Sequence, residues 1–451
     1  AAPSGGEIAD PRRFRALAII ALAQLMVILD ASIVTIALPS TAAGLHISVA
    51  NRPWVITAYT LAFGSLLLLG GRIADFVGRK RIFEIGLVGF AAASTLAGLA
   101  QDAPMLFGAR ALQGAFAGLL APAALSLVTV TFTDAKERAR AFGVYGAVSG
   151  SAIAIGVIMG GILVQWASWR WTMLVNLPIA LIALAGSRRL VSESKAEGEA
   201  HYDPVGTAVV TAGLAALVYG FTKAESAGWT SAVTLAILAA AVVLLAGFVA
   251  IETRVEHPLL PLRILTDRSR AGAYLGILLM PAGLLGGFVL LTYYLQGILG
   301  YSPIKTGLAY LPYSVAMFVG STLAGKLMTR IRPRLLLVGG MALGAIGLGL
   351  FAQVGVHTGF WSLVVPAEVV TALGLGLAFP PLTSTALVVV EPGDAGVASG
   401  LFNAGQQVGS SLGVALLNTI AATAAASYLA SHGLSTVAQA SGPVHGYITA
   451  F

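Results

Sequence analysis

Thirteen apolar stretches follow one another along almost the whole chain, and the loops between them are short and carry most of the charged residues. Most stretches reach about 20 residues, the length at which an α-helix crosses the ~30 Å hydrocarbon core of a bilayer. No water satisfies backbone N–H and C=O groups there, so these stretches are expected to be helices. The predicted spans are residues 16–38, 53–73, 82–100, 104–132, 138–166, 169–190, 204–222, 230–251, 270–297, 303–328, 334–353, 359–388 and 395–425. The sequence therefore predicts an all-α polytopic membrane protein.

The charge content argues against most other classes of protein. Charged residues make up only 10% of the chain and hydrophobic residues 57%, whereas soluble domains carry about 25% charged residues. The absence of cysteine excludes disulfides, cysteine-ligated zinc and iron–sulfur clusters. The pI of 9.7 comes from basic residues in the loops between spans, so membrane topology explains it better than nucleic-acid binding. No cluster of histidines and acids has metal-ligand spacing, and we expect no metal, no cofactor and no nucleic-acid partner.

The basic residues are divided unequally between alternate loops. If the N-terminus lies in the cytoplasm, most of the 26 Lys and Arg residues are cytoplasmic. Arg52, Arg170, Lys223 and Lys305 then lie outside, and Arg110 lies within the membrane. Cytoplasmic loops of membrane proteins carry an excess of Lys and Arg. We therefore expect a multi-pass protein with a cytoplasmic N-terminus.

The end of the given sequence looks like the start of another apolar segment. Residues 444–451 read VHGYITAF, and thirteen spans would leave the C-terminus outside. We predict a fourteenth span whose helix is missing from the given chain; the alternative is a protein of thirteen spans.

Two similar loops indicate an internal repeat. Residues 70–80 follow the second span and residues 325–334 follow the tenth, and both show glycine, a basic residue, aliphatic residues and then a basic turn. Repeated halves with a site at their interface are a transporter architecture. We predict two six-helix bundles with two inserted helices, a 6+2+6 arrangement. Its units are residues 1–190, residues 191–267 with the inserted pair, and residues 268–451.

Asp30 is a bare carboxylate in the first span, where no other charged residue lies between Arg15 and Arg52. A charge at membrane depth is costly and marks a functional site by default. Arg110, in the fourth span, lies at a similar depth in the outer half of the membrane, and its guanidinium stays charged. We expect the two to pair. Either a conformational change alters the pair and so moves a proton, or the pair is static and only joins two helices.

Several segments together resemble the fourteen-helix drug:proton antiporters of the major facilitator superfamily. The segments are LDASIVTIALP at residues 29–39, the loop at residues 71–81, residues 110–122 of the fourth span, SWRWTMLVNLP at residues 168–178 and YLQGILGYSPIKTGLAYLP at residues 294–312. The resemblance covers essentially the whole chain. It implies the major facilitator fold, location in the bacterial cytoplasmic membrane and proton-driven export of drugs.

The chain departs from this pattern at a few positions. Val157 replaces a proline of the fifth-span motif, which puts a kink there in doubt. Thr35 stands where relatives often have asparagine. The tenth span has no acid, and the thirteenth has Asn403, Gln406 and Gln407 where exporters of dications tend to have acids. We therefore expect neutral or monocationic substrates rather than dications.

The resemblance also implies roles for the basic loop and for the glycines of the fifth span. In the family the loop contributes to a charge network that closes the cytoplasmic gate, which would here involve Gly71, Asp75, Gly78, Arg79 and Glu84; the alternative is a loop that only sets topology. The fifth-span glycines would let helices approach closely where the halves meet, although glycine is common in any membrane bundle. These are Gly146, Gly150, Gly156, Gly160 and Gly161.

Glu368 is the other acid deep in an apolar stretch. It is either a second proton or cation site, or a neutral acid bonded to a backbone carbonyl. Polar and aromatic residues of several spans are candidates for an amphipathic substrate cavity, although each alone is more often a packing or lipid-facing residue. They are Trp54, Tyr59, Gln113, Tyr293, Tyr294, Gln296, Tyr310, Tyr313, Phe379, Asn403 and Gln407.

Two short motifs that mimic enzymes are rejected. Residues 320–326 mimic a phosphate loop, but Leu327 replaces the Ser or Thr that would bind Mg²⁺ and no strand precedes it. Residues 409–413 mimic a hydrolase elbow but lie within a predicted membrane helix. Without an ATP site, transport has to be secondary, and we expect no enzymatic activity.

The hypothesis is a proton-coupled exporter of hydrophobic or amphipathic small molecules that works by alternating access. Its partners would be such substrates, protons and membrane lipids, and the protein is expected to be a monomer. One alternative is a lipid or lysolipid translocase on the same fold. Another is a membrane sensor or scaffold without transport, which would need no charged pair at membrane depth.

Overall fold

The computed structural model describes residues 12–48, 51–52, 54–195, 203–255, 258–387, 394–432 and 436–451. Within these residues the chain is helical and has no strand. In this described part thirteen helices are long and apolar enough to cross a membrane, which confirms the predicted all-α polytopic class and the thirteen spans predicted within the given sequence. Residues 53 and 388, at the ends of two predicted spans, lie outside the described part.

The first seven helices form six spans, because α6 and α7 together make one. They are α1 (Arg13–Gly44), α2 (Trp54–Val77), α3 (Arg79–Gly98), α4 (Ala103–Thr131), α5 (Ala135–Trp166), α6 (Trp169–Leu174) and α7 (Asn176–Leu190). Two further spans follow, α8 (Pro204–Ala227) and α9 (Ala232–Glu252).

The remaining spans include two π-helical turns, η2 and η3. The elements are α10 (Arg263–Thr266), α11 (Arg268–Tyr293), η2 (Tyr294–Ile298), α12 (Pro303–Ala309), α13 (Leu311–Leu327), α14 (Pro333–Phe351), η3 (Phe360–Val364), α15 (Val365–Leu387), α16 (Ala395–His432) and α17 (Thr436–Ala450). The predicted start of a further span, residues 444–451, belongs mostly to α17, which packs on α16.

Aspartates begin several of the helices. The side chain of Asp102 accepts a hydrogen bond of 2.8 Å from the amide of Met105 at the start of α4. Asp134 accepts hydrogen bonds from the amides of Glu137 and Lys136 at the start of α5, and these bonds hold the pKa of Asp134 below its ordinary value. A side chain in this position satisfies amides that have no partner within the helix. The spans therefore begin where polar caps follow the loops.

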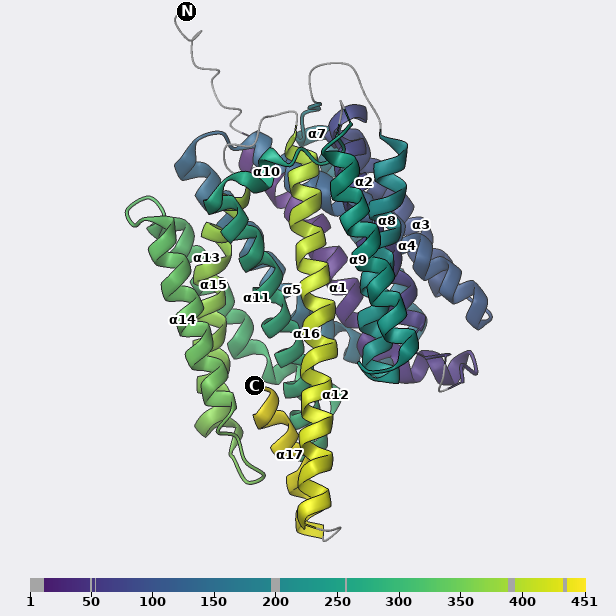
Figure 1. Ribbon diagram of the computed structural model, residues 1–451, viewed down its shortest axis with the longest axis vertical. Coiled ribbons are helices and arrows are strands. Elements are labelled where there is room, and N and C mark those ends of the chain that lie inside the picture. Colours follow the sequence, from purple (N-terminus) through teal and green to yellow (C-terminus); the bar gives the residue numbers. More distant parts are fainter. Residues whose placement is uncertain are drawn as a thin grey trace, which may run out of the picture.

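The helices pack as two similar groups. In the first half α4 packs against α2 and α3, and in the second α15 packs against α13 and α14. The pair α8 and α9 pack on each other, and α8 also lies against α2 and α16. In Figure 1 the long helix α16 runs through the molecule, with α13, α14 and α15 on one side and α2, α3, α4, α8 and α9 on the other. This packing supports, as a proposal, the division of the chain at residues 190 and 268.

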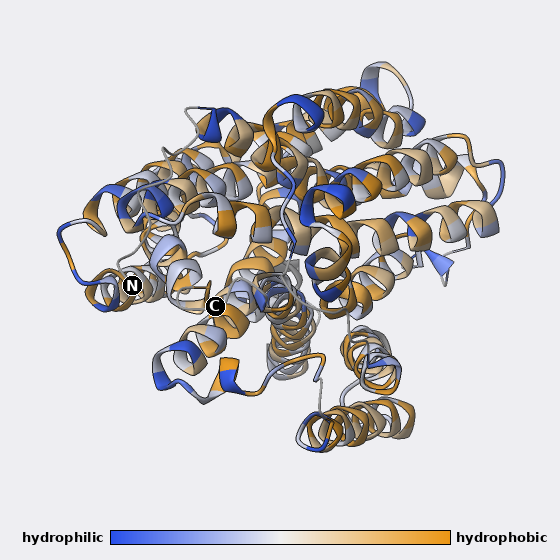
Figure 2. Cartoon of the chain, turned by 90° about the horizontal axis from the view of Figure 1, so that it is seen from above, coloured by the Kyte–Doolittle hydropathy of each residue, from blue (hydrophilic) through white to orange (hydrophobic). Residues whose placement is uncertain are grey.

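The two halves meet along two pairs of helices. Helix α5 lies against α13, and α2 lies against α16. A methyl group at Gly143 would lie 3.0 Å from the carbonyl oxygen of Ser321, and one at Gly161 would lie 2.8 Å from Ile304, so α5 follows α12 and α13 over most of its length. Figure 2 shows that hydrophilic residues gather in the loops and at helix ends, whereas the helices themselves are mainly hydrophobic.

Candidate functional site

Asp30 lies in the middle of α1 and is fully buried. Its carboxylate accepts three hydrogen bonds, from Arg110 Nη1 at 2.6 Å, Gln113 Nε2 at 2.8 Å and Asn176 Nδ2 at 2.7 Å. The ion pair with Arg110 is equally buried. A buried charge is tolerated only where it is paired and hydrogen-bonded. These three donors therefore provide the environment of a stable carboxylate.

Arg110 is held from several sides. Its Nε donates to the backbone carbonyl of Val55 at 3.1 Å, and its Nη1 also donates to Gln113 Oε1 at 2.7 Å. The guanidinium lies 4.4 Å from the centre of the Tyr59 ring, a cation–π contact. The position of the guanidinium thus depends on α2 and α4 as well as on the carboxylate of α1.

Ser94 of α3 completes this group. Its hydroxyl accepts hydrogen bonds from Gln113 at 3.2 Å and from Asn176 at 2.9 Å, and it donates to the carbonyl of Met173 at 2.7 Å. Reasoning from the sequence missed Ser94 and Asn176 as site residues. Asn176 lies within the motif at residues 168–178, so the sequence contained a signal for it. Ser94 is one of several serines in apolar helices, and no sequence signal marks it as a site residue.

The hydrogen bonds around Asp30 link α1, α2, α3, α4, α6 and α7, and we call these residues the Asp30 network. A protonated carboxyl has one donor and less acceptor capacity than a carboxylate. Protonation of Asp30 would therefore remove the charge that pairs with Arg110 and weaken the bonds from Gln113 and Asn176. One proton would change the forces among the helices of the first half.

A second network lies at the end of the bundle where α2 ends and α16 begins, which we call the basic end. The carboxylate of Asp75 is fully buried and accepts hydrogen bonds from the amides of Gly396 at 2.9 Å and Val397 at 3.1 Å. Arg79, one turn further on, donates to the same carboxylate at 2.6 Å. Gly71 lies directly against the carbonyl of Gly396. Asp75 therefore joins the two halves at this end.

Further charges that the sequence reasoning missed surround this contact. Asp394 accepts from Arg263 at 2.5 Å, and it lies 3.7 Å from the guanidinium of Arg72. Arg72 also lies over the ring of Phe76, 4.5 Å from its centre. These residues come from α2, α10 and the start of α16, so their meeting depends on how the halves pack.

Gly78 and Glu84 lie beside this network without joining Asp75. Gly78 has a φ of 121°, a conformation that glycine adopts readily and other residues rarely. The side chain of Glu193 lies close to Gly78 in space. It accepts hydrogen bonds from the amides of Lys80 at 3.0 Å and Arg81 at 3.1 Å, and so caps α3. Glu84 accepts a hydrogen bond of 3.0 Å from Ser187 of α7. Glu84 thus bonds within the first half.

The five glycines of α5 face different neighbours. Gly156 and Gly160 lie against α1, where methyl groups would lie 3.1 Å from the carbonyl of Leu29 and 3.3 Å from that of Ile33. The other three face the second half: Gly146 lies against Phe379, Gly150 against Met317 and Gly161 against Ile304. Helix α5 therefore uses glycine both within its own half and at the junction.

The predicted cavity residues do not gather around one cavity in this conformation. Tyr59 and Gln113 belong to the Asp30 network, and Trp54 and Tyr293 are 39% and 49% exposed. The members at the junction of the halves are Phe379 beside Gly146, Gln407 beside Gly64, and Asn403, which bonds to the carbonyl of Ser399 in its own helix. In the second half, Tyr294 donates a hydrogen bond to the carbonyl of Gly355, and Tyr310 donates one to the carbonyl of Phe288. Tyr313 and Gln296 are half-buried. Burial of apolar helix faces has brought these residues to separate places.

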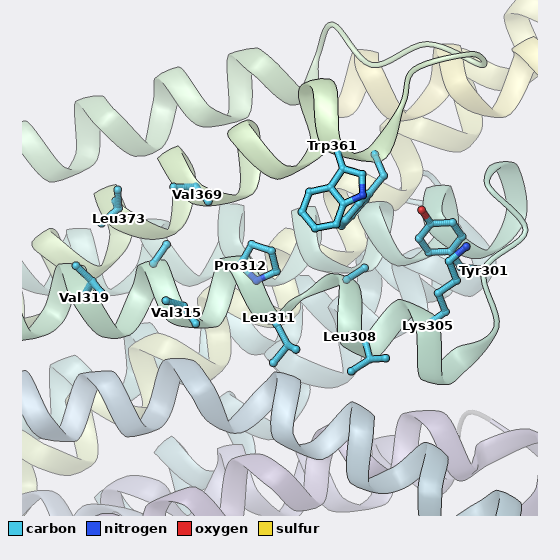
Figure 3. A pocket seen from close by; sticks show the side chains of 13 residues that line it. Tyr301, Lys305, Leu308, Leu311, Pro312, Val315, Val319, Trp361, Val369 and Leu373 are labelled. Atoms are coloured by element: carbon cyan, nitrogen blue, oxygen red, sulfur yellow. The ribbon is translucent and has the colours of Figure 1, made fainter.

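A groove of about 680 Å³ lies elsewhere, between α12, α13 and the start of α15. Its lining is Tyr301, Lys305, Leu308, Ala309, Leu311, Pro312, Val315, Ala316, Val319, Phe360, Trp361, Val369 and Leu373. In Figure 3, Lys305 and Tyr301 lie at one end of the groove, and Val319 and Leu373 lie at the other. Lys305 Nζ lies 3.8 Å from the centre of the Tyr301 ring. Trp361 is 77% exposed, so the groove opens on the outer surface of the bundle.

Glu368 lies in the second half, in α15, and is fully buried. Neither of its carboxyl oxygens has a hydrogen-bond partner among the described residues. Glu368 is therefore separate from the Asp30 network and differs from Asp30 in that no described residue serves as its counterion or hydrogen-bond donor. Among the described residues no group of three or more His, Cys, Asp and Glu side chains has an arrangement that would hold a metal ion.

Comparisons with known proteins agree with this architecture. The family model "Major Facilitator Superfamily" matches residues 20–414. The chain superposes on the human organic anion transporter MFSD10 with a TM-score of 0.65, covering 98% of each chain at 15% identity. It superposes on the proton:xylose symporter XylE with a TM-score of 0.60, covering 98% of this chain and 95% of that one at 16% identity. These two likenesses confirm the predicted major facilitator fold.

Relatives of higher identity include proteins of three Streptomyces species. The puromycin resistance protein pur8 of Streptomyces alboniger is 48% identical over 98% of this chain and 88% of its own. A probable actinorhodin transporter of Streptomyces coelicolor is 38% identical over 93% of this chain and 74% of its own. The tetracenomycin C resistance and export protein of Streptomyces glaucescens is 35% identical over 91% and 76%. The chain belongs to the Major Facilitator Superfamily, and its relatives there include antibiotic exporters and resistance proteins.

Proposed function

We propose that this protein is a proton-coupled antiporter that exports hydrophobic or monocationic antibiotics and related small molecules from a bacterium. The observation that carries the proposal is the fully buried Asp30 carboxylate, held by Arg110, Gln113 and Asn176. Asp30 is the acid of this network, and its proton affinity depends on three donors carried by other helices. A movement of those helices changes proton binding, and proton binding changes the forces on the helices.

In the proposed cycle, the state with a charged Asp30 is the one in which all three donors contact it. Uptake of a proton releases Arg110 and favours the other state. Substrate and proton need not touch, because each only has to bind one state more tightly than the other. Antiport follows when proton and substrate favour opposite states.

The basic end acts as the cytoplasmic gate in this proposal. Asp75 joins α2 to the first turn of α16 here, so this conformation is closed at that end. The unequal distribution of Lys and Arg supports a cytoplasmic position for the basic end and for the N-terminus. The membrane is then the bacterial cytoplasmic membrane, the protein acts as a monomer, and the proton gradient is its energy source without a cofactor.

The names of the relatives guide the choice of substrates. They include proteins of resistance to puromycin and of export of tetracenomycin C. The tenth and thirteenth spans supply no acid that would pair with a dication. We therefore expect export of amphipathic antibiotics of neutral or single positive charge, with puromycin as the first compound to examine.

Substrate efflux from proteoliposomes tests the proposal. An imposed pH gradient is expected to drive efflux of puromycin or ethidium by the wild type, and Asp30→Asn, which cannot change charge, is expected to bind substrate but to ignore the gradient. Asp102→Asn is the matched control, because Asp102 is an exposed helix cap and asparagine serves equally well there. Equal gradient dependence of wild type and Asp30→Asn would refute the role of Asp30.

A lipid or lysolipid translocase is the second candidate, and one observation favours it. The groove between α13 and α15 is lined by apolar side chains that face the surface of the bundle, and it has Lys305 at one end. Such a groove suits an acyl chain with an anionic headgroup near the ammonium. Transfer of labelled lipid between leaflets of the same proteoliposomes, without antibiotic efflux, would favour this function over the first.

A further inference from the structure

Contacts between helices relate the second half to the first position by position. A methyl group at Gly118 would lie 3.1 Å from Cβ of Leu66, and one at Gly376 would lie 3.1 Å from Gly320. Likewise Gly86 faces Leu120, and Gly340 faces Ala378. In both comparisons α4 corresponds to α15 with a shift of 258 residues, and α2 and α3 correspond to α13 and α14 with a shift of 254. The two halves thus repeat one helix packing.

The same shifts place Glu368 where the first half has Arg110. They also place Tyr313 at the position of Tyr59, whose ring carries the guanidinium of Arg110. The prolines inside α4 and α15 correspond as well. The second half therefore has a buried ionisable residue at the position equivalent to Arg110, with the opposite sign of charge.

Among the described residues of the second half, none takes the place of Asp30 and balances this residue. Helix α11, which corresponds to α1, carries no Arg, Lys, Asp or Glu between residues 271 and 298. Helices α5, α13 and α14 carry such residues only near their ends, and α16 carries none. Among the described residues, the titratable groups that interact with Glu368 are the hydroxyls of Tyr310 and Tyr313, which are neutral phenols and give it no counterion. An isolated carboxylate in such a place would be very costly. In this conformation Glu368 therefore holds a proton.

A purely structural role does not fit the contacts. A neutral acid that stabilised the fold would donate its proton to a carbonyl or hydroxyl, yet neither oxygen of Glu368 has a partner in the part of the chain that is described. The hydroxyl of Thr371, one turn further on at the position of Gln113, is buried without a partner as well. Glu368 is also too enclosed for a substrate. What this site suits is a proton.

We propose that Glu368 is a second proton carrier, so that the protein exchanges two protons for each substrate molecule. The inference rests on the proposed antiport. The carboxyl group of Glu368 is protonated in the conformation closed at the basic end. In the other conformation its O–H bond breaks and the proton leaves to water on the cytoplasmic side. Asp30 and Glu368 would each carry one proton, in separate halves of the molecule.

The substrate concentration ratio that a given pH difference sustains at equilibrium reports how many protons are exchanged for each substrate molecule. Ethidium, a permanent monocation, is the probe, and the membrane potential is held at zero with valinomycin and equal potassium. One pH unit is worth about 1.4 kcal/mol per proton, so one proton sustains about a tenfold ethidium ratio and two protons about a 100-fold ratio. We expect about 100-fold for the wild type and for Asp102→Asn, and about tenfold for Glu368→Gln.

Each outcome decides between the claims. A ratio of about 100 for the wild type and about ten for Glu368→Gln supports the second carrier. A wild-type ratio of about ten overturns it and leaves the antiport standing, and this measurement does not depend on the variant folding. An equal ratio of about 100 in both proteins also overturns it, because the second proton then travels elsewhere. No gradient-driven transport by the wild type contradicts the proposed antiport itself.

Discussion

Replacing Asp75 by alanine should open the basic end of the molecule. The carboxylate of Asp75, in α2, accepts hydrogen bonds from the amides of Gly396 and Val397 in the first turn of α16, at 2.9 and 3.1 Å. These bonds exist only while α2 and α16 are in contact. Alanine removes both, so the closed conformation loses stability and the open conformation does not.

The size of the effect follows from the number of bonds. A hydrogen bond to a charged group contributes about 1.5–3 kcal/mol, so two of them contribute about 3–6 kcal/mol to the closed conformation. The ratio of open to closed molecules should therefore rise by a factor of about 10² to 10⁴. The ion pair between Asp75 and Arg79 lies within one half and does not enter this estimate.

Spin labels measure this ratio directly, because the chain has no cysteine and two introduced cysteines are then the only attachment sites. Labels at Thr133 and Arg332, which are exposed on opposite halves at the basic end, report the separation by double electron–electron resonance. In the wild type we expect one short distance, and in Asp75→Ala a longer distance should dominate. Asp102→Ala, an acid at the far end of α4, should leave the distribution unchanged. An unchanged distribution in Asp75→Ala would refute the assignment of this contact as the gate.

Two further predictions concern the first half. Asn176→Ala removes one of the three donors to Asp30, a loss of about 1.5–3 kcal/mol that should lower the initial rate of gradient-driven efflux about tenfold or more. The control is Gln353→Ala, because Gln353 is an exposed amide just after the end of α14 that donates to the carbonyl of Gly349. Equal rates in the wild type and Asn176→Ala would contradict the role of Asn176. Gly114→Leu should lower the melting temperature, because a Cβ there would lie 3.0 Å from the carbonyl carbon of Tyr59 and force α2 away from α4, at a cost of about 1–3 kcal/mol. The control is Gly108→Leu, where nothing lies within 4 Å of the added Cβ, and it should melt like the wild type. Equal melting temperatures of the two variants would contradict this packing.

The spans and the acid–base pair could be predicted because both follow from the bilayer. Thirteen apolar stretches must form helices, and charges as rare as Asp30 and Arg110 at one depth have few other partners available. The donors Gln113 and Asn176 are a different case. Gln113 was expected to line a cavity, and it bonds to the carboxylate instead, because two helices that lie far apart in sequence bring the amide and the acid together.

The groove and the gate charges could not be predicted for a related reason. Lys305 and Trp361 belong to short helical segments that look ordinary in the sequence, and they share a groove because α12 and η3 both border it in the folded chain. Asp394 meets Arg72 and Arg263 across the junction of the halves. Local patterns carry no information about which turns of distant helices face each other.

Glu368 shows where the sequence ends and the tertiary structure begins. The sequence by itself determined that the chain crosses a membrane, that its halves repeat and that three ionisable residues lie deep in apolar helices, because the hydrocarbon of the bilayer penalises every unsatisfied backbone group and charge. It left open whether Glu368 is bonded to a carbonyl. Only the packing of α15 against α13 and α14 decided that Glu368 occupies the position of Arg110 and has no counterion among the described residues, because partners are assigned by contacts between helices and not by order along the chain.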